Sequence, residues 1–389
     1  MKTSAVKRFA PRAVNVVLAG SRGIPPRYGG AETFVYELGK RLQSEFRVFV
    51  TCESNRFAID THEGFTRIHV YTPQPPSLTI PVIYDIIATL YAIKHVRPDI
   101  IYYVAPDGAY AAVIAKLARS RVVVNTDGLE WKRLLIRQKY SSPLNKPIHL
   151  LTAFALLVAE FLACKIPDAT IADSLVIKHY LESRWKPRKI AYMAYGARHL
   201  PKVDPEASKK VLQKYGLAPY RYFLTVGRFV AENNLHLVIR AFKHARTSDK
   251  LVLVGLASLR DPYVKHLLKL RGHDKRIVLL PPVYDSVELS ALRSSCKAYV
   301  HPYTVGGTNP SLLEQLQFDR PILVYDAPFH REILGSKGIY FKTAEELADL
   351  ITKIESSGTQ SVTFVDISRR FSWEVIAKKY AALFRKLAR

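Results

Sequence analysis

One stretch late in the chain, residues 305–314, has the residue types of an anion-binding helix start: Val-Gly-Gly-Thr-Asn-Pro-Ser-Leu-Leu-Glu. The Gly306–Gly307 pair lacks Cβ atoms, so the backbone there can bend sharply or approach a ligand closely. Thr308 or Asn309 can cap a helix, and Pro310 suits its first position. Such a helix start has unpaired N–H groups and a partial positive charge, which together favour a phosphorylated ligand.

Ser311 and Glu314 are three residues apart, so a helix places both on one face. A hydroxyl and a carboxylate would then point toward whatever ligand lies at the helix start. The alternative is an ordinary capped helix with a solvated acid in its first turns.

A cation is expected at the same place. Arg228 follows the strand-like run Tyr222–Gly227 and would emerge at the carboxyl end of that strand, on the same sheet edge as Gly306–Ser311. A guanidinium there can grip phosphate oxygens. The alternative is a surface arginine on a loop.

The first half of the chain offers two further candidates. Gly29 and Gly30 end a glycine-rich loop after the apolar run Val14–Ala19, and Asp127 and Glu130 follow the strand-like run Arg121–Asn125. Ligands of parallel sheets bind beyond the carboxyl ends of the strands, where both segments would lie. The dipeptide after Thr126, Asp-Gly, is also a good turn, which is the structural alternative for that carboxylate.

These candidates require strands that alternate with helices. The apolar spacing predicts strands and helices in alternation in both halves, which implies parallel sheets with right-handed crossovers. The predicted strands are Val14–Ala19, Arg47–Thr51, Arg67–Tyr71, Ile100–Val104 and Arg121–Asn125 in the first half, and Tyr222–Val226, Lys250–Val254, Arg276–Leu280, Ala298–His301 and Ile322–Tyr325 in the second. The polar segment Leu200–Pro219 is the best linker candidate.

Composition limits the class of protein. A chain of 389 residues exceeds the usual single-core limit, which predicts two domains. The formal charge of +25 predicts an anionic partner, without choosing between nucleic acid, an acidic membrane and a phosphorylated small molecule. Cys52, Cys164 and Cys296 show neither disulfide nor metal spacing, which favours a reducing compartment. The basic stretch Met1–Ala13 lacks the apolar core of a signal peptide, so we expect a cytoplasmic protein.

The most apolar segment is Ile148–Cys164, which we expect to be a long and mostly buried helix, shorter than the roughly 20 residues needed to span a bilayer. Several basic residues lie around it, and they would suit shallow docking on anionic lipid. These are Lys146, Lys165, Lys178, Lys186, Arg188 and Lys189. The alternative is a core helix beside a solvated basic face.

Several nucleotide-binding motifs are missing. No Gly-x-Gly-x-x-Gly follows the first strand, and no Gly-Lys-Ser/Thr loop occurs, which argues against a dinucleotide dehydrogenase and a P-loop NTPase. There is no Asp-x-Asp to hold a divalent cation on a diphosphate. Charge neutralisation is therefore expected from helix ends and cations, with no metal and no cofactor.

The motifs, taken together, resemble a known family over nearly the whole chain. The sequence resembles the retaining, GT-B type glycosyltransferases of family 4, and within them a subgroup of bacterial rhamnosyltransferases. The resemblance rests on Gly20–Phe34, Asn125–Arg133, Ile171–Ser174, Val226–Asn234, Pro282–Asp285, Val305–Glu314 and Pro328–Gly335. It implies two Rossmann-like, doubly wound parallel-sheet α/β domains facing across a cleft, with a C-terminal helix that crosses back. The domain limits expected are 1–205, 206–370 and 371–389.

The resemblance also implies roles. The second domain would bind a sugar nucleotide, with the diphosphate at the start of the helix, Glu314 accepting hydrogen bonds from ribose hydroxyls and Arg228 facing the diphosphate. The residues expected to bind the donor are Gly29, Gly30, Arg228, Asn233, Gly307, Thr308, Asn309, Ser311, Leu312 and Glu314. Asp127, Glu130 and Arg228 are the candidates for the chemistry.

The sequence departs from the family pattern at three positions. Gly306 stands where the first glutamate of the family's Glu-x7-Glu pair would be, Asn233 where the lysine of its phosphate clamp would be, and Asp127 where a sugar-facing histidine would be. The rhamnosyltransferase subgroup shares the first two changes, which indicates a variation in donor handling. The third leaves the role of Asp127 and the donor sugar open.

The function expected is a metal-independent glycosyltransferase. It would move a sugar, with dTDP-rhamnose as the expected donor, to a lipid-linked or cell-envelope glycan, at the cytoplasmic face of the membrane with peripheral contact to anionic lipid. One alternative is a sugar-nucleotide epimerase with the same fold. The other is a basic nucleic-acid-binding protein, which is disfavoured because no nucleic-acid module is recognised.

Overall fold

The computed structural model describes residues 13–26, 29–73, 80–197, 200–256, 258–357 and 361–389. The basic residues 1–12 lie outside this part. The described chain forms two compact units. One contains the residues up to Val124 with Ile166–Ala169 and Ala377–Arg389, and the other contains Asn125–Lys165 and Thr170–Ile376. The domain limits expected from the sequence, 1–205, 206–370 and 371–389, stay predictions.

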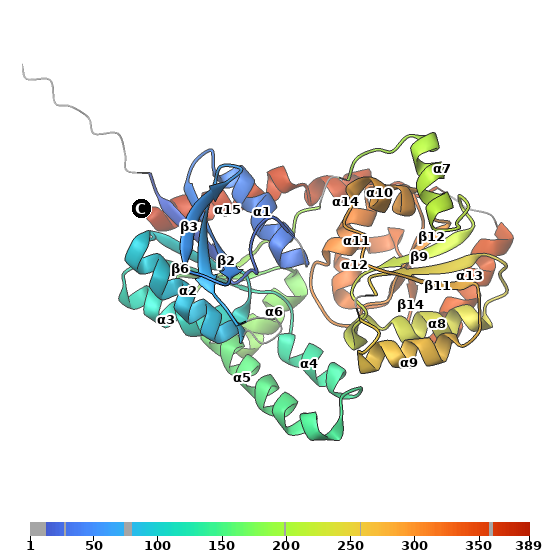
Figure 1. The fold of residues 1–389 in the computed structure, drawn as a ribbon, viewed down its shortest axis with the longest axis horizontal. Coiled ribbons are helices and arrows are strands. Elements are labelled where there is room, and N and C mark those ends of the chain that lie inside the picture. Colours follow the sequence, from blue (N-terminus) through green and yellow to red (C-terminus); the bar gives the residue numbers. More distant parts are fainter. Residues whose placement is uncertain (1–12, 27–28, 74–79, 198–199, 257, 358–360) are drawn as a thin grey trace, which may run out of the picture. The chain divides into compact units, whose positions relative to one another are not determined.

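Two sheets carry the fold. The first has eight strands in the order β3-β4-β2-β1-β5-β6-β7-β8, and the second has six in the order β11-β10-β9-β12-β13-β14. The β3–β4 pair is antiparallel, and the other pairings described are parallel. Helices lie on both faces of each sheet (Figure 1). The predicted fold class, two doubly wound parallel-sheet α/β domains, is confirmed.

The elements have the following limits. The strands are β1 Asn15–Ala19, β2 Arg47–Ser54, β3 Ala58–His62, β4 Phe65–Tyr71, β5 Ile100–Tyr103, β6 Arg121–Thr126, β7 Ala169–Ala172, β8 Ile190–Tyr192, β9 Tyr222–Val226, β10 Lys250–Val254, β11 Ile277–Leu280, β12 Ala298–His301, β13 Ile322–Tyr325 and β14 Ile339–Phe341. The α-helices are α1 Gly30–Leu42, α2 Pro81–His95, α3 Ala109–Leu117, α4 Glu130–Gln138, α5 Lys146–Lys165, α6 Leu175–Arg184, α7 Pro205–Lys214, α8 Leu235–His244, α9 Pro262–Arg271, α10 Ser286–Ser294, α11 Pro310–Gln315, α12 Pro328–Leu334, α13 Ala344–Ser357, α14 Val365–Arg370 and α15 Trp373–Ala388.

Strands buried on both faces were the easiest to predict. Every residue of β1, β5 and β12 is buried, and such strands read as continuous apolar runs in the sequence. The edge strand β3 was missed because its three central residues are exposed, so it does not form a buried apolar run. Helix α7 was also missed. It lies within Leu200–Pro219, the segment predicted as a linker, and begins at an Asp204 cap whose carboxylate accepts from the N–H of Ala207.

The prediction that Ile148–Cys164 is mostly buried is wrong. The helix, α5, spans 20 residues, and only 28% of its most apolar 18-residue window is buried. By length and composition alone it could cross a membrane. Ala159, Glu160, Ala163 and Cys164 of its second half are buried, whereas Phe161 and the large apolar side chains of its first half are exposed. Apolar composition alone cannot distinguish these two environments.

The end of the chain packs into the first unit, as expected for a helix that crosses back. Tyr380 of α15 contacts Phe34 of α1 and Tyr102 of β5, with ring centroids 5.6 and 5.5 Å apart. The Tyr380 and Tyr102 hydroxyls lie 3.3 Å from each other. All three rings are buried, so α15 covers part of the core of this unit.

We therefore expect Tyr380→Ala to lower the free energy of unfolding by about 3 kcal/mol, because it leaves a cavity among aromatic rings. Urea unfolding followed by circular dichroism measures this change. The exposed Lys378, two residues before Tyr380 on α15, provides the matched control Lys378→Ala. Equal shifts for the two variants would contradict the packing role of α15.

Candidate functional site

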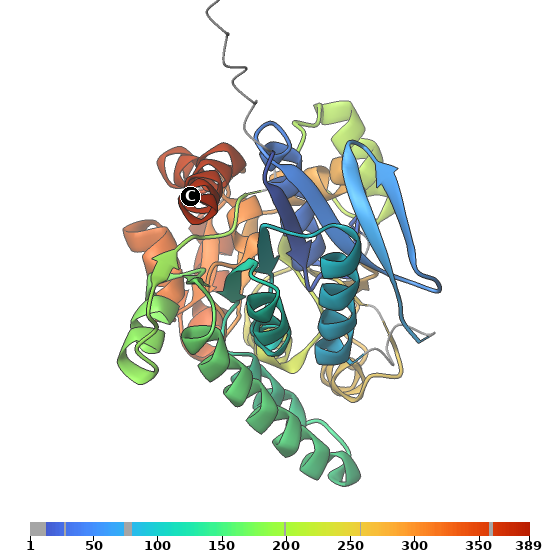
Figure 2. The same cartoon turned by 90° about the vertical axis from the view of Figure 1, so that its left-hand side faces the viewer.

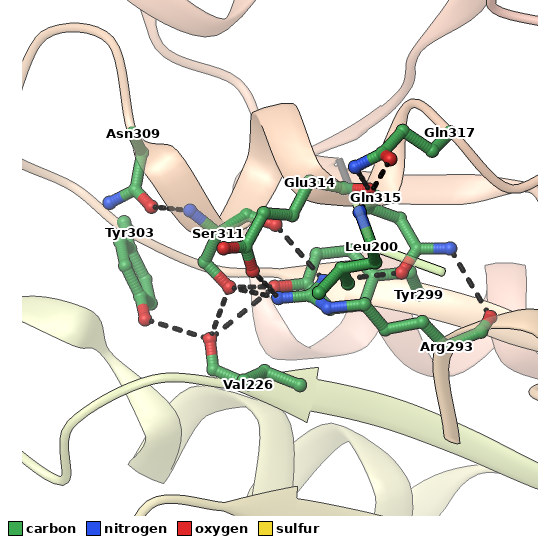
Figure 3. Close-up of polar contacts among 10 residues, drawn as sticks. All are labelled: Leu200, Val226, Arg293, Tyr299, Tyr303, Asn309, Ser311, Glu314, Gln315 and Gln317. Carbon is green, nitrogen blue, oxygen red and sulfur yellow. Dashed lines mark hydrogen bonds and ion pairs between the residues drawn. The ribbon is translucent and has the colours of Figure 1, made fainter. Parts of the chain in front are cut away.

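The second sheet brings two loops to one edge. Strands β9 and β12 are parallel neighbours, so the loops that follow them leave the sheet on the same side. The carbonyl of Val226, the last residue of β9, accepts hydrogen bonds from Ser311 Oγ at 2.8 Å and from the Tyr303 hydroxyl at 3.2 Å (Figure 3). These bonds join the loop after β12 to the end of β9.

Gly227 is required at this junction. Its φ of 158° lies in the region that favours glycine, and a Cβ there would come within 1.6 Å of the Tyr303 hydroxyl oxygen. The close approach of the two loops therefore depends on a residue without a side chain.

The helix start predicted at residues 305–314 is present. Asn309 caps α11, accepting from the N–H of Ser311 at 3.0 Å, and Pro310 occupies the first helical position. The apolar spacing predicts a helix over Ser311–Phe318, and the observed helix is shorter. It ends at Gln315, after which Phe318 N–H donates to the Gln315 carbonyl in a turn. A proline at position 321 follows, and helices usually end before proline.

Ser311 and Glu314 share one face of α11, as expected, and a single buried cation contacts both. Arg293 of α10 donates from Nη2 to Glu314 Oε2 at 2.9 Å and to Ser311 Oγ at 3.0 Å. Its Nη1 donates to the Ser311 carbonyl at 3.1 Å and to Gln315 Oε1 at 3.3 Å (Figure 3). The Ser311 hydroxyl also lies 2.8 Å from that of Tyr299, over whose ring Arg293 packs.

Arg293 was not predicted as a site residue. Its side chain is 0% exposed, although arginine is almost never fully buried unless it is paired. The sequence carries no signal for it, because an arginine in the last turn of a helix is ordinary.

Arg228 lies where it was predicted, just beyond the end of β9. It is exposed, and in the described part of the chain its guanidinium makes no hydrogen bond. Its backbone carbonyl accepts from the Asn233 amide at 2.8 Å. Asn233, which replaces the expected lysine, therefore holds the Arg228 loop, and both residues stay predicted donor contacts.

A second group of predicted residues faces the glycine turn from α4 and the loop before it. Arg133 forms an ion pair with Glu130, and its Nη2 lies 3.4 Å from the position of a Cβ on Gly306. A Cβ on Gly128 would come within 3.5 Å of Gly306 Cα, so the two backbones lie close together. Burial raises the pKa of Asp127, and Arg133 opposes that shift. Arg133 thus stands beside the position at which the family's first glutamate is absent.

Asp173 also reaches the turn. Its carboxylate accepts from the N–H of Thr308 at 2.9 Å, and the Thr308 hydroxyl donates to its carbonyl. A Cβ on Gly307 would lie 2.0 Å from Asp173 Oδ1, so a side chain there would force the Asp173 carboxylate to move. The expectation of unpaired N–H groups at this helix start is therefore wrong for Thr308 and Ser311. The first is paired with Asp173 and the second with Asn309.

A third contact ties α4 to the Arg228 loop. Arg137 donates from Nε to both carboxylate oxygens of the buried Glu232, at 2.9 and 3.0 Å. Glu232 precedes Asn233, so this pair fixes the segment that carries the Asn233 amide. Arg133, Asp173 and Glu232 lie in motifs noted in the sequence, and Arg137 follows one of them, but nothing there assigned these residues a position.

The remaining predicted residues are placed as follows. Leu312 is fully buried, and its N–H donates to the Asn309 carbonyl. Gly29 and Gly30 lie in the other unit, where Gly29 caps α1, and their approach to a donor stays a prediction. Among the described residues, no group of three or more His, Cys, Asp or Glu side chains is arranged to hold a metal ion.

The chain matches two family models. Residues 13–198 match a domain of unknown function (DUF1972). Residues 208–371, which contain Arg228, Arg293 and α11, match glycosyl transferases group 1. The protein is a glycosyltransferase. The resemblance to family 4 is confirmed at this level, whereas the rhamnosyltransferase subgroup stays a proposal.

Solved structures give the same fold. Sucrose-phosphate synthase from Thermosynechococcus elongatus superposes with a TM-score of 0.78 at 15% identity, over 97% of this chain and 99% of that one. HepE from Anabaena, in complex with UDP-glucose, superposes with a TM-score of 0.73 at 17% identity, over 96% of this chain and 99% of that one. Trehalose 6-phosphate synthase from Burkholderia multivorans superposes with a TM-score of 0.69 at 12% identity, over 97% of each chain. The glycosyltransferase has the GT-B fold. No curated protein matches it in sequence.

We expect Arg293→Met to lower the free energy of unfolding by about 3–5 kcal/mol, because Glu314 then lacks its partner. The double variant Arg293→Met with Glu314→Leu should recover part of that loss, since it removes both charges. Urea unfolding of the wild type, the two single variants and the double variant measures the coupling energy between Arg293 and Glu314, and the exposed Arg246→Met is the control. If the losses of the two single variants simply add up to the loss of the double variant, the pairing is contradicted.

Asp173 generates a pH prediction. Burial and the nearby Asp127 hold the pKa of Asp173 well above its ordinary value. The folded-state pKa is raised, so its contribution to stability is present below the unfolded pKa of about 3.9 and is lost as pH rises through the folded value. We expect Asp173→Asn, which keeps an acceptor for Thr308, to unfold at a higher urea concentration than the wild type at pH 7.

The advantage of this variant should vanish as the pH is lowered to about 3, where Asp173 is largely protonated in both states. The exposed Asp366→Asn in α14 is the matched control. A stability difference that does not change with pH would rule out a proton-linked origin.

Proposed function

We propose that this glycosyltransferase takes its sugar from a nucleotide diphosphate donor, retains the anomeric configuration, and requires no metal. The observation that carries the proposal is the arrangement at one sheet edge. An exposed guanidinium, Arg228, follows β9, and the neighbouring loop leads into α11 with Ser311 and Glu314 on one face. The diphosphate of such a donor needs a cation, and the hydroxyls of its ribose need a hydrogen-bond acceptor. This sheet edge carries both.

The similar structures support a nucleotide donor. HepE from Anabaena was solved with UDP, with UDP and glucose, and with UDP-glucose. A trehalose-phosphate synthase from Burkholderia xenovorans is described as UDP-forming. These proteins share the fold of this chain, and the match of residues 208–371 to group 1 glycosyl transferases lies over the candidate donor residues.

The proposed chemistry follows from the leaving group. Cleavage of a glycosyl–phosphate bond places positive charge on the sugar and negative charge on the departing diphosphate. Arg228 stabilises the diphosphate, and such preorganised groups stabilise the transition state more than the ground state. The departing phosphate helps to deprotonate the acceptor on the same face. Asp127 and Glu130 orient the sugar or the acceptor.

Glu314 accepts from the ribose hydroxyls in this proposal. One of its carboxylate oxygens is held by Arg293, which leaves the other free to face the ligand. The side chain is 14% exposed, so it is close to solvent although its partner is buried.

The finer parts of the proposal rest on the resemblance to rhamnosyltransferases. The donor is dTDP-rhamnose, and the acceptor is a lipid-linked or cell-envelope glycan. The enzyme works at the cytoplasmic face of the membrane, with peripheral contact to it. The high positive charge of the chain supports anionic partners of both kinds.

We expect Arg228→Ala to reduce kcat/KM for transfer by about 10²–10³, the usual cost of removing one transition-state donor. Arg246→Ala is the control, because Arg246 is also exposed but precedes β10 instead of following a strand of the donor edge. Transfer is measured with a panel of UDP, dTDP and GDP sugars and a membrane extract as acceptor. Equal turnover of the two variants would refute the donor-site assignment.

Mass spectrometry of the products separates the remaining outcomes. A sugar transferred to an acceptor supports the proposal. Conversion of the sugar nucleotide without acceptor would identify an epimerase instead. If the wild type neither binds nor hydrolyses any donor in the panel, the proposal is wrong.

A further inference from the structure

The first half of α5 presents an apolar stripe to solvent. Ile148, Leu150, Leu151 and Phe154 are 62, 54, 70 and 64% exposed. Leu150, Leu151 and Phe154 are spaced i, i+1 and i+4, which places them on one face of the helix. Soluble proteins rarely expose contiguous apolar patches, and such patches mark interaction sites. We call these four residues the α5 stripe.

The second half of α5 is fixed inside the protein. Glu160 is buried, and its carboxylate accepts from Trp131 Nε1 at 3.1 Å, the Tyr180 hydroxyl at 3.0 Å and Trp185 Nε1 at 2.7 Å. A helix that crossed a bilayer would have to release these partners and place a carboxylate in hydrocarbon. The free half is about 10 residues, roughly 15 Å long at 1.5 Å per residue. It is therefore too short to span a hydrocarbon core of about 30 Å.

The stripe belongs to a helical hairpin made by α4 and α5, which pack along each other. Figures 1 and 2 show the joined end of this hairpin projecting past the neighbouring helices. On α4, Ile136 packs against the core of the second sheet, and so does Tyr140 in the connection. The contacts of Ile136 and Tyr140 therefore hold the hairpin through α4, while the α5 stripe stays exposed.

The surroundings of the stripe are positively charged. From Trp131 to Ala159 the chain has five Lys or Arg residues and no Asp or Glu. Lys132, Lys139 and Lys146 of this segment are exposed. Of the basic residues expected to dock on lipid, Lys178 instead pairs with Glu182 on its own helix. The cations near the stripe are thus the ones available to an anionic surface.

An apolar helix face bordered by cations fits one kind of partner best. Amphipathic helices of this composition lie in the headgroup region of anionic membranes, with the apolar face buried and the cations on lipid phosphates. A second copy of this chain would bring the same cations together, which like-charge repulsion opposes.

We propose that the α5 stripe docks into the headgroup region of an anionic membrane, with Lys139 and Lys146, at the joined end of the hairpin, on the lipid phosphates. The inference rests on the proposed function, because a lipid-linked acceptor lies at that surface. It identifies the part of the chain that makes the contact. Docking is peripheral, since Glu160 keeps the rest of α5 in the protein.

Flotation of the full chain with lipid vesicles tests the inference. The wild type should float with vesicles of phosphatidylcholine and phosphatidylglycerol but not with phosphatidylcholine alone, and added salt should weaken the binding. The double variant Leu151→Glu with Phe154→Glu should bind at least about tenfold more weakly, because two buried apolar contacts are lost.

Leu117→Glu is the matched control. Leu117 is 81% exposed at the end of α3, so it is an equally apolar surface residue outside the hairpin. Unchanged circular dichroism and unchanged calorimetric binding of the sugar nucleotide that the wild type binds show that each variant is folded. The vesicle assay contains neither donor nor acceptor, so its result is independent of the proposed reaction.

Four results would overturn the inference. The wild type could fail to float with anionic vesicles, or Leu117→Glu could lose binding as strongly as the double variant. Sedimentation could instead reveal a dimer of the wild type that the double variant dissociates without any vesicle binding. That outcome would assign the stripe to contact between copies of the chain. Resistance of bound protein to alkaline extraction would contradict peripheral docking.

Discussion

The buried guanidinium of Arg293 is the contact on which the candidate donor site depends. It donates to Ser311, Glu314 and Gln315, which are all residues of α11. A helix of six residues is marginal by itself, because nucleation is costly and few backbone bonds repay it. Its position therefore comes from outside the helix. Ser311 in turn binds the carbonyl of Val226, so the orientation of Glu314 is linked from α10 through α11 to β9.

Parallel strands impose the second constraint, and it explains what could be predicted. Once Tyr222–Val226 and Ala298–His301 are recognised as buried strands of one sheet, the loops after them can share an edge. Arg228 and residues 306–311 then come together without any knowledge of side-chain contacts. The Asn-Pro pair likewise fixes the start of α11, because its capping chemistry is local.

What could not be predicted depends on contacts between distant segments. Arg293 precedes Glu314 by 21 residues, and Asp173 precedes Thr308 by 135. Neither pairing leaves a local pattern. Arg133 and Arg137 lie on α4, a helix for which no element was predicted from the sequence. The exposure of α5 was missed for a related reason. Its apolar residues surround the helix almost completely, so their spacing does not indicate which face is covered.

Gly307 has a consequence for how this sequence can evolve. A Cβ at this position would lie 2.0 Å from the carboxylate of Asp173, whose other oxygen accepts from Thr308. A side chain at position 307 is incompatible with the present position of the Asp173 carboxylate, and a shorter residue at 173 would give up the contact with Thr308. A substitution of Gly307 therefore depends on a change at position 173, although the two residues are 134 apart in the sequence.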